Sequence, residues 1–482
     1  MEILHISAEC YPAAKAGGLG DVVGALPKYL TASGTSAGVI MPKYKLKFMQ
    51  NNEFEVVHHG SVRIHNQHFP FTVERTMNDE LGYHLYMVNI PGKFDRPGIY
   101  ADPHTGGFGD SVSRWLCFQQ AVLQWVVSFS ADLKPKVLHC HDHHTGLIPF
   151  MVKHCPEYKA LANIPTVFTI HNGQYHGNYS WDKMHLLPYF DAEARSLLDW
   201  QNTINPLATG IKCCWRLTTV SQSYLEELTQ NSNGLESLVG HEWHKARGII
   251  NGIDNDVWHP AKDSYLAEHL KRKNVSKFKA ENKKVLAEHF NIDINRPIFT
   301  FIGRLVGEKG AEIIPDLVRN HIKAGYEGAF LLLGTGQKSL MEKLKWMPHE
   351  FPGRFDARLE YNEGLAHQMY AGSDFLLMPS RVEPCGLNQM YSMRYGTIPV
   401  VRAIGGLKDT VIDVGDEGGR GFRFLQLTVE DAFHAVRRAT EFYRNADDVS
   451  TLRKRIMDLD FSWQNSAKQY SKIYDELIGV SA

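Results

Sequence analysis

The sequence predicts an α/β fold made of two doubly wound domains, and three observations lead to this fold class. Short apolar runs alternate with glycine-containing loops and helical patterns along the whole chain. Continuous apolar strands that alternate with helices are typical of parallel sheets covered on both faces. The chain of 482 residues is too long for one compact core, so more than one domain is expected. The strand–loop–helix pattern that opens the chain returns in its second half, which predicts two similar domains.

Eight apolar runs mark the expected strands. Those of the first half lie at residues 2–7, 136–142, 164–172 and 216–221. Those of the second half lie at residues 296–304, 329–336, 374–380 and 397–403. Between the halves, residues 248–266 combine an Asn-Gly turn with a polar, proline-containing connection, which predicts the domain boundary there. Because ligands of doubly wound sheets bind beyond the carboxyl ends of the strands, we expect a ligand-binding cleft between the two domains.

Composition excludes several classes of protein. The formal net charge is -1, with 43% hydrophobic and 22% charged residues, so nothing draws the chain toward nucleic acid or anionic membranes. No apolar run reaches the ~18 residues that span a bilayer, and the N-terminus lacks the pattern of a signal peptide. The seven cysteines form no CxxC pair. This favours reduced thiols in a cytoplasmic protein over a disulfide framework or a zinc ribbon.

A lysine and a glycine pair follow the first expected strand. Lys15 precedes Gly17 and Gly18, and a helical pattern begins near Gly20. Glycine lets the backbone approach a ligand closely, a helix N-terminus attracts anions, and the lysine adds a positive charge. The spacing matches neither a P-loop nor the dinucleotide-binding motif. Two interpretations therefore stand, a tight packing turn and a phosphate-binding loop.

Two loops of the second half carry charged residues just beyond expected strands. Arg304 and Lys309 would suit a diphosphate leaving group if they face a ligand, and would otherwise be ordinary surface charges. Glu383 precedes a turn into a helix, where it could accept hydrogen bonds from sugar hydroxyls or act as an acidic N-cap. Cys385 in the same turn fits a small packed side chain better than an activated thiol.

Histidines gather after two expected strands of the first half. The first group consists of His139, His141, His143 and His144 around Asp142. A metal site is disfavoured, because the strand holds only some of these side chains on one face and no second ligand motif follows. We prefer a strand-end Asp142 that hydrogen-bonds a hydroxylated ligand. His171 ends the next run, where it is either a structural hydrogen-bonding group or part of a site.

Together these segments resemble the family of ADP-glucose-dependent glycogen and starch synthases, and its bacterial members in particular. The motifs occur in the family's usual order, from about residue 3 to about residue 477. They are KAGGLGDVVGALP, HCHDHHTGLIP, TIHNGQYHG, VSQSY, GIINGIDNDVWHP, GRLVGEKG, PSRVEPCGLNQMYSMRYGTIPVVRAIGGLKDTV and FSWQNSAKQYSKIYDEL. Many related retaining glycosyltransferases carry a second glutamate eight positions after the first. Here that position is Tyr391, as in the ADP-glucose class.

The sequence departs from the family pattern at several positions. His143 stands where the family usually has tryptophan, and Asn388 stands where threonine is common. The motif GRLVGEKG replaces the usual SRLxxQKG but keeps Arg304 and Lys309. None of these changes removes a residue to which the resemblance assigns a catalytic role.

The resemblance implies a GT-B fold, in which two doubly wound domains face each other across a cleft. Residues 1–248 would form the N-terminal, acceptor-side domain with the lysine–glycine donor loop. Residues 249–455 would form the domain that binds the nucleotide sugar, and residues 456–482 a final helix that crosses back to the first domain. The resemblance also implies the transfer of glucose from ADP-glucose to the non-reducing end of an α-1,4-glucan, with retention of configuration.

Site residues follow from the same resemblance. The catalytic set is Glu383, His171, Asp142, Arg304 and Lys309. The donor-binding set is Lys15, Gly18, Arg304, Lys309, Tyr361, Cys385, Gly386 and Leu387, and the acceptor-binding set is Tyr100 and Asp142. Arg304 and Lys309 would stabilise the diphosphate, Glu383 would orient the glucose, and Tyr361 would stack on the adenine. Neither a metal ion nor pyridoxal phosphate is expected, and the expected partners are ADP-glucose and α-1,4-glucans rather than nucleic acid or membranes.

Two other functions remain open from the sequence. An α-glucan phosphorylase would share the architecture and the glucan, but it needs pyridoxal phosphate and is normally much longer. A non-catalytic glucan-binding protein would not need Lys15, Arg304, Lys309 and Glu383 together in register.

Overall fold

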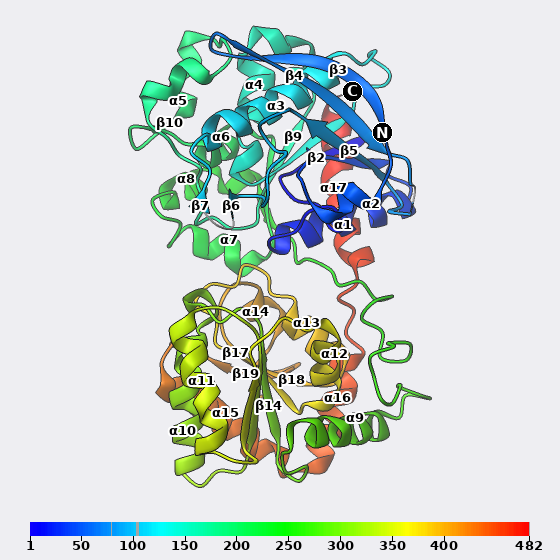
Figure 1. Ribbon diagram of the computed structural model, residues 1–482, viewed down its shortest axis with the longest axis vertical. Helices are drawn as coiled ribbons and strands as arrows, with labels where there is room; N and C mark the ends of the chain where they lie inside the picture. Colours follow the sequence, from blue (N-terminus) through cyan, green and yellow to red (C-terminus); the bar gives the residue numbers. More distant parts are fainter. Residues whose placement is uncertain (79, 103–105, 482) are drawn as a thin grey trace. The chain divides into compact units, whose positions relative to one another are not determined.

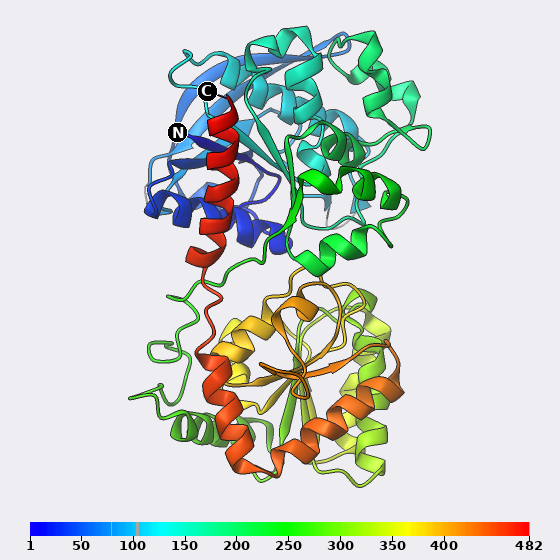
Figure 2. The same ribbon diagram turned by 180° about the vertical axis from the view of Figure 1, so that it is seen from behind.

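The computed structural model describes residues 1–78, 80–102 and 106–481, and the chain divides into two compact units. Unit 1 consists of Met1–Val220, Leu225–Gly252 and Trp463–Ala482. Unit 2 consists of Ser221–Tyr224 and Ile253–Ser462. The main division thus falls after residue 252 and again after residue 462, where the sequence analysis places it at 249 and 456. Figure 1 shows the chain coloured along its length, and Figure 2 shows it from behind.

Unit 1 is built on a nine-stranded sheet with the order β13-β12-β9-β8-β1-β2-β5-β4-β3. Its strands are β1 (Ile3–Ile6), β2 (Ala37–Pro42), β3 (Phe54–Ile64), β4 (Gln67–Thr76), β5 (His84–Asn89), β8 (Val137–His141), β9 (Thr166–Ile170), β12 (Arg216–Thr219) and β13 (Ala246–Gly248). Neighbours from β13 to β5 run parallel, whereas β4 is antiparallel to both β5 and β3. Every residue of β1, β8 and β9 is buried, as expected of central strands covered on both faces.

Two small two-stranded sheets accompany this sheet. They are β6 (Ala101–Asp102) with β7 (Gly106–Gly107), and β10 (Asp199–Trp200) with β11 (Thr203–Ile204). The helices in the first 252 residues are α1 (Gly18–Ala32), α2 (Lys47–Asn51), α3 (Ser111–Val127), α4 (Ile148–His154), α5 (Arg195–Leu198), α6 (Pro206–Cys213), α7 (Gln222–Leu228) and α8 (Glu236–His241).

The last helix of the chain completes unit 1. Helix α17 (Trp463–Ser481) lies beside α1, and Figure 2 shows it in red against the N-terminal segments in blue. Its side chains Tyr470, Tyr474 and Leu477 are at most 1% exposed and pack in one apolar cluster with residues of α1 and β1. Because this apolar surface is removed from water, unit 1 depends on residues from both ends of the chain.

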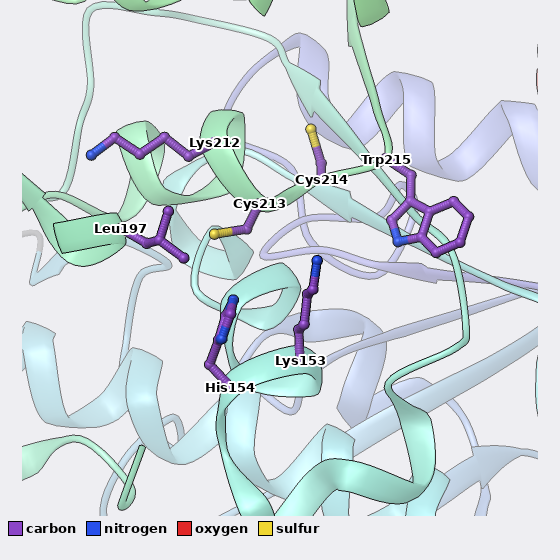
Figure 3. Close-up of a pocket in the computed structure, with 7 residues that line it drawn as sticks. All are labelled: Lys153, His154, Leu197, Lys212, Cys213, Cys214 and Trp215. Atoms are coloured by element: carbon purple, nitrogen blue, oxygen red, sulfur yellow. The ribbon is translucent and has the colours of Figure 1, made fainter. Parts of the chain in front are cut away.

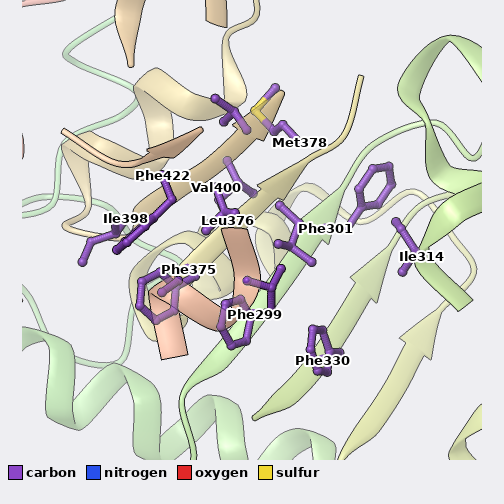
Figure 4. Packing of buried hydrophobic residues seen from close by; sticks show 14 of the residues in the cluster. Phe299, Phe301, Ile314, Phe330, Phe375, Leu376, Met378, Ile398, Val400 and Phe422 are labelled. Atoms are coloured by element: carbon purple, nitrogen blue, oxygen red, sulfur yellow. The ribbon is translucent and has the colours of Figure 1, made fainter. Parts of the chain in front are cut away.

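Unit 2 contains a six-stranded, wholly parallel sheet with the order β16-β15-β14-β17-β18-β19. Its strands are β14 (Ile298–Ile302), β15 (Ala329–Leu333), β16 (Phe355–Arg358), β17 (Phe375–Met378), β18 (Ile398–Arg402) and β19 (Phe422–Phe424). Its helices are α9 (Val275–Phe290), α10 (Ile314–Lys323), α11 (Lys338–Glu350), α12 (Glu363–Gly372), α13 (Asn388–Arg394), α14 (Gly405–Thr410), α15 (Val429–Tyr443) and α16 (Ala446–Met457). Phe299 stacks between Phe330 and Phe375 in the core (Figure 4), with ring centroids 5.2 and 4.8 Å apart.

The predicted fold class is confirmed, since both units are α/β with parallel strands and interleaved helices. Each of the eight apolar runs contains a strand. The antiparallel extension β3–β4–β5 was not predicted from the sequence. Few residues of strand β3 are buried, and the strand therefore lacks a continuous apolar run. Among the described residues, no helix is long and apolar enough to cross a membrane.

Candidate active site

The predicted polar residues of unit 1 lie where neighbouring strands end. Asp142 follows β8 and His171 follows β9, and these strands pair in parallel. The carboxyl ends of parallel neighbours meet at one edge of the sheet, so the two residues are brought together. Oδ1 of Asp142 accepts a hydrogen bond of 2.7 Å from the backbone N–H of His171. Asp142 itself has a φ of 56°, a left-handed conformation that is uncommon outside glycine and occurs often at functional sites.

Burial changes the protonation of both side chains. It raises the pKa of Asp142 to about 7, although backbone N–H groups of His171 and Asn172 act in the opposite direction. It also lowers the pKa of His171 to about 3, so this imidazole is neutral at physiological pH. The edge therefore combines a carboxyl group that titrates near neutrality with an uncharged imidazole.

Tyr100 joins this edge through a residue that the sequence analysis misses. Its hydroxyl donates to Glu9, which lies three positions beyond the end of β1, and its ring stacks on His144 with centroids 4.9 Å apart. Burial, and then the nearby Glu9 carboxylate, raise the pKa of the Tyr100 phenol. The signal for Glu9 was present in the sequence, since it is a carboxylate just after a central strand.

Glu9 also organises the lysine–glycine loop. Its Oε2 accepts hydrogen bonds from the backbone N–H groups of Ala16 (2.6 Å) and Gly17 (3.0 Å), just ahead of α1. Burial raises the pKa of Glu9, although these bonds and the one from Tyr100 oppose the effect. Part of the loop's anion-binding backbone is thus occupied by a carboxylate of the protein itself.

The remaining groups of this loop lie at the surface. Nζ of Lys15 is 2.7 Å from Oδ1 of Asp21 in the first turn of α1 and lies over the ring of Tyr11. Gly18 is the first residue of α1 and is exposed, with open space where a Cβ atom would stand. A ligand could therefore approach the backbone of Gly18 directly.

In unit 2, a second ion pair joins two of the predicted residues. Lys309 follows β14 and Glu383 follows β17, which is the parallel neighbour of β14. Nζ of Lys309 donates to both carboxylate oxygens of Glu383, at 2.8 and 2.7 Å. The hydroxyl of Ser380 donates to Oε2 of the same carboxylate at 2.8 Å. Glu383 is only 6% exposed, so its charge is held largely out of water by these two partners.

Gly310 shapes the loop that carries Lys309. Its φ of 63° is left-handed, and an added Cβ atom would lie 1.8 Å from the carbonyl oxygen of Pro379. The loop after β14 can therefore pack against the end of β17 only because a glycine follows Lys309.

Two other predicted residues of unit 2 lie at the surface. The side chain of Arg304 is 64% exposed and reaches Glu308 at 3.1 Å. Tyr361, just before α12, is 85% exposed. Both are accessible to a ligand in solution.

The turn between Glu383 and α13 is well anchored. Cys385 is 5% exposed, and its carbonyl oxygen accepts a hydrogen bond from Gln389. Gly386 has a φ of 71°, and Leu387 directly precedes α13. Asn388 donates from Nδ2 to the carbonyl oxygen of Ile302 at 2.7 Å, which ties the turn to the end of β14.

Three buried histidines of unit 1 place one ring nitrogen each within 4.8 Å of one another, namely His5, His139 and His141. Most of their ring nitrogens have hydrogen-bond partners, however, and only Nε2 of His5 has none among the described residues. His139 bonds the hydroxyls of Tyr474 (2.7 Å) and Thr169 (2.6 Å), and Nδ1 of His5 lies 3.1 Å from Nε2 of His141. The rings of His139 and His141 are stacked rather than directed at a common point. These contacts form a buried hydrogen-bonded cluster in the core of unit 1.

A separate cavity of about 420 Å³ lies at the C-terminal ends of α4 and α6 (Figure 3). Its lining residues are Lys153, His154, Leu197, Lys212, Cys213, Cys214 and Trp215. None of the predicted site residues is among them. Lys212 donates to the carbonyl oxygen of Asp199 at 2.7 Å, so one of its two lysines already has a partner within the fold.

Comparisons with known proteins assign the chain to a class. The starch synthase catalytic domain family matches residues 2–241, and the family of group 1 glycosyl transferases matches residues 282–442. Because both units match glycosyltransferase families, the protein is a glycosyltransferase.

Individual relatives narrow this class. A glycogen synthase from Flavobacterium johnsoniae is 46% identical over 479 residues, which cover 99% of each chain. A glycogen synthase from an Anaeromyxobacter species is 37% identical, again over 99% of each chain. The catalytic domain of starch synthase IV from Arabidopsis thaliana, bound to ADP and acarbose, superposes with a TM-score of 0.86 at 29% identity over 99% of each chain. The chain belongs to the glycogen and starch synthase family, which confirms the resemblance, and it has that family's GT-B fold.

Proposed function

We propose that this glycosyltransferase moves glucose from ADP-glucose to the non-reducing end of an α-1,4-glucan, with retention of configuration. The names of the relatives support the reaction, and the ADP and acarbose bound to the Arabidopsis relative support both ligand classes. The observation that carries the proposal is the pairing of Lys309 with Glu383 at the strand ends of unit 2. In this pair, a cation that would bind a phosphate lies beside a carboxylate that would accept hydrogen bonds from sugar hydroxyls.

The barrier lies in breaking the bond between the anomeric carbon and the phosphate oxygen. Negative charge then develops on the departing ADP, and positive character develops on the sugar. Arg304 and Lys309 would stabilise the diphosphate, helped by Lys15 and by the amides of Gly18 and of residues 386–387. Removing one stabiliser of this kind typically costs about 3–4 kcal/mol of transition-state binding.

Other residues would hold the sugars and the base. Glu383 would accept hydrogen bonds from the glucose hydroxyls and counter the positive character of the ring. Asp142 and His171 would lie on the sugar side, and the neutral His171 could donate or accept a hydrogen bond without adding charge. Tyr100 would contact the acceptor and Tyr361 would stack on the adenine, while the buried Cys385 would contribute through its turn.

The division of labour between segments is part of the proposal. Residues 1–248 would serve the acceptor, residues 249–455 would bind the nucleotide sugar, and residues 456–482 would complete the first domain. The lysines and the arginine would supply positive charge at the diphosphate, so the reaction would need no metal ion. Pyridoxal phosphate would have no part in it either. All seven cysteines are free thiols, which supports a cytoplasmic setting.

Purified protein should release ADP and lengthen a maltooligosaccharide when given ADP-glucose, and should do so faster than it releases UDP from UDP-glucose. Activity should survive dialysis against EDTA. Absence of ADP release with active-site residues intact would support a non-catalytic glucan-binding protein. Absorbance of bound pyridoxal phosphate, with glucose 1-phosphate formed from glucan and phosphate, would instead identify a phosphorylase.

A further inference from the structure

Three histidines from three neighbouring strands form a hydrogen-bonded chain inside unit 1. His5 lies on β1, His141 ends β8 and His171 follows β9. Nδ1 of His5 is 3.1 Å from Nε2 of His141, and Nδ1 of His141 is 2.9 Å from Nε2 of His171. His5 and His141 are fully buried and His171 is 8% exposed. This chain of hydrogen-bonded histidines therefore runs from the core to His171, a residue of the candidate active site.

Each ring can supply only one proton to this chain. Burial lowers the pKa of His5 and of His171 to about 3, and it lowers the pKa of His141 as well. All three rings are therefore neutral, with one N–H donor and one bare nitrogen acceptor each. Both hydrogen bonds must then run in the same direction along the chain, because His141 can donate to only one neighbour.

The inner end of the chain selects the direction. Nε2 of His5 is buried and has no hydrogen-bond partner among the described residues. If the protons pointed inward, this atom would carry a buried N–H group without an acceptor, and orphaned buried donors are rare in proteins. If the protons point outward, Nε2 of His5 is a bare nitrogen. The N–H groups of His5 and His141 then each donate a hydrogen bond to the next ring.

We infer that His5 and His141 are positioning residues that hold His171 in the tautomer with its proton on Nδ1. His5 donates from Nδ1 to His141, and His141 donates from Nδ1 to Nε2 of His171. Nε2 of His171 is then an acceptor, so its only ring proton is on Nδ1. No described residue accepts a hydrogen bond from that atom. His171 thereby offers a fixed donor to an oxygen atom of a bound ligand.

The consequence for catalysis rests on the proposed function, in which His171 lies beside the transferred glucose. A free imidazole in water exchanges between two tautomers. The chain would remove that exchange and keep the donor ready before the ligand arrives. Such preorganisation is how a hydrogen bond becomes effective in a transition state.

The tautomer can be measured without any substrate. Protein labelled with ¹⁵N at its histidines would be examined by NMR, and the His171 signals assigned from their loss in His171→Gln. We expect a protonated Nδ1 and an unprotonated Nε2 in the unliganded protein. A protonated Nε2, or an even mixture of the two forms, would overturn the inference, and both forms are read from the wild-type protein.

Two variants test whether the hydrogen bonds from His5 and His141 fix the tautomer of His171. His141→Phe keeps a ring against His139 but removes both nitrogens, so the His171 signals should shift to a mixture of tautomers. The matched control is Tyr474→Phe, which removes a hydroxyl partner of His139 in the same core but leaves the His5–His141–His171 chain intact. It should leave the His171 signals unchanged. An unchanged tautomer in folded His141→Phe would refute the positioning role.

Kinetics then separate this inference from the proposed function. With the tautomer lost, kcat for glucosyl transfer should fall about tenfold while the KM for the donor changes little, as expected when a preorganised donor is lost. If the tautomer is lost but kcat is retained, the positioning of His171 stands. The catalytic assignment of His171 is then the part that fails.

Discussion

Lys309 donates to both oxygens of the nearly buried Glu383, so we expect this cation to matter to stability as well as to the proposed reaction. In Lys309→Ala, the Glu383 carboxylate would lose both hydrogen bonds from Lys309 and keep the one from the hydroxyl of Ser380. We expect kcat to fall at least about tenfold, which is 1.4 kcal/mol of transition-state stabilisation. We also expect the free energy of unfolding to fall by about 1–3 kcal/mol. Steady-state kinetics and urea denaturation measure the two effects.

A matched control lies nearby. Arg381 is 2.7 Å from Glu312, but both side chains are well exposed. Since exposed ion pairs contribute about 0–1 kcal/mol, Arg381→Ala should be nearly silent in stability. Near-normal turnover of folded Lys309→Ala would remove Lys309 from the proposed mechanism.

Asp142 makes the stability of unit 1 depend on pH. Its pKa is about 7 in the folded protein, against an ordinary value of 3.8. Between these values the folded state binds more protons than the unfolded state, so the free energy of unfolding falls as the pH rises. Between pH 5 and pH 8 this carboxyl should lower the free energy of unfolding by roughly 2–3 kcal/mol, since each pKa unit is worth about 1.4 kcal/mol. Asp142→Asn should lose that slope in urea denaturation.

Asp413 provides the control of opposite sign. Burial acts to raise its pKa, but the ion pair with Arg438 and backbone N–H bonds outweigh this and lower it. Its stabilising effect is then present above the ordinary pKa of an aspartate and is lost only in acid. The loss of unfolding free energy caused by Asp413→Asn should be constant between pH 5 and pH 8. An equal slope in Asp142→Asn and the wild type would contradict the raised pKa.

At this scale, the sequence predicts which residues stand at strand ends but not which partners they have. Asp142 with His171, and Lys309 with Glu383, could be grouped because parallel neighbours end at one edge. The bonds of Glu9 to the lysine–glycine loop and of Ser380 to Glu383 could not. They depend on side-chain rotamers and on the packing of residues far apart in the sequence.

Among the elements, the loop between β14 and α10 gives a sharp test. Gly310 is left-handed, and a Cβ atom there would overlap the carbonyl oxygen of Pro379. Gly310→Ala should therefore lower the free energy of unfolding by about 1–3 kcal/mol and reduce kcat, because Lys309 is displaced. Gly307, in the same loop, has open space around its Cβ position. Gly307→Ala should be tolerated, and equal effects of the two substitutions on unfolding and kcat would contradict this account.

The elements themselves were predictable where their apolar runs are continuous. The central strands β1, β8, β9 and β17 are buried along their length, as is β14 except at its last residue, and all five stand out in the sequence. The edge strands β13 and β19 do not stand out, because they contain only three residues each. Strand β3 of the antiparallel extension does not stand out either, because many of its residues are exposed. For such strands, pairing with neighbours rather than local pattern decides the conformation.

For the whole molecule, unit 2 is largely an insertion within the chain of unit 1. The two ends of that insertion meet, since a Cβ atom on Gly252 would lie 2.4 Å from Cα of Trp463. A chain in which residues 1–252 are joined by a short glycine linker to residues 463–482 should fold. It should show one cooperative urea transition and ordered aromatic side chains by near-ultraviolet circular dichroism.

The control for this experiment ends at residue 252. It lacks Tyr470, Tyr474 and Leu477, which are buried in the core of unit 1. We expect it to aggregate or to unfold without cooperativity, because a large apolar surface is left open. Equal stability of the two chains would mean that α17 is dispensable for unit 1.

The fold class of the whole molecule could be predicted because two runs of alternating strands and helices leave few other architectures. The family could be predicted because eight motifs keep their order along the chain. The resemblance also implies that the last helix returns to the first domain, but the buried side chains through which unit 1 depends on it follow only from the packed structure.

That dependence also sets an order of events during protein synthesis. Domains usually fold from the N-terminus as the chain leaves the ribosome, at about 5–20 residues per second. Here the unit that is translated first must wait for α17, which emerges only after unit 2, while unit 2 can finish folding beforehand. The nascent N-terminal region therefore exposes an incomplete apolar face for roughly 10–40 s, and this is the interval in which a chaperone would be most useful to the cell.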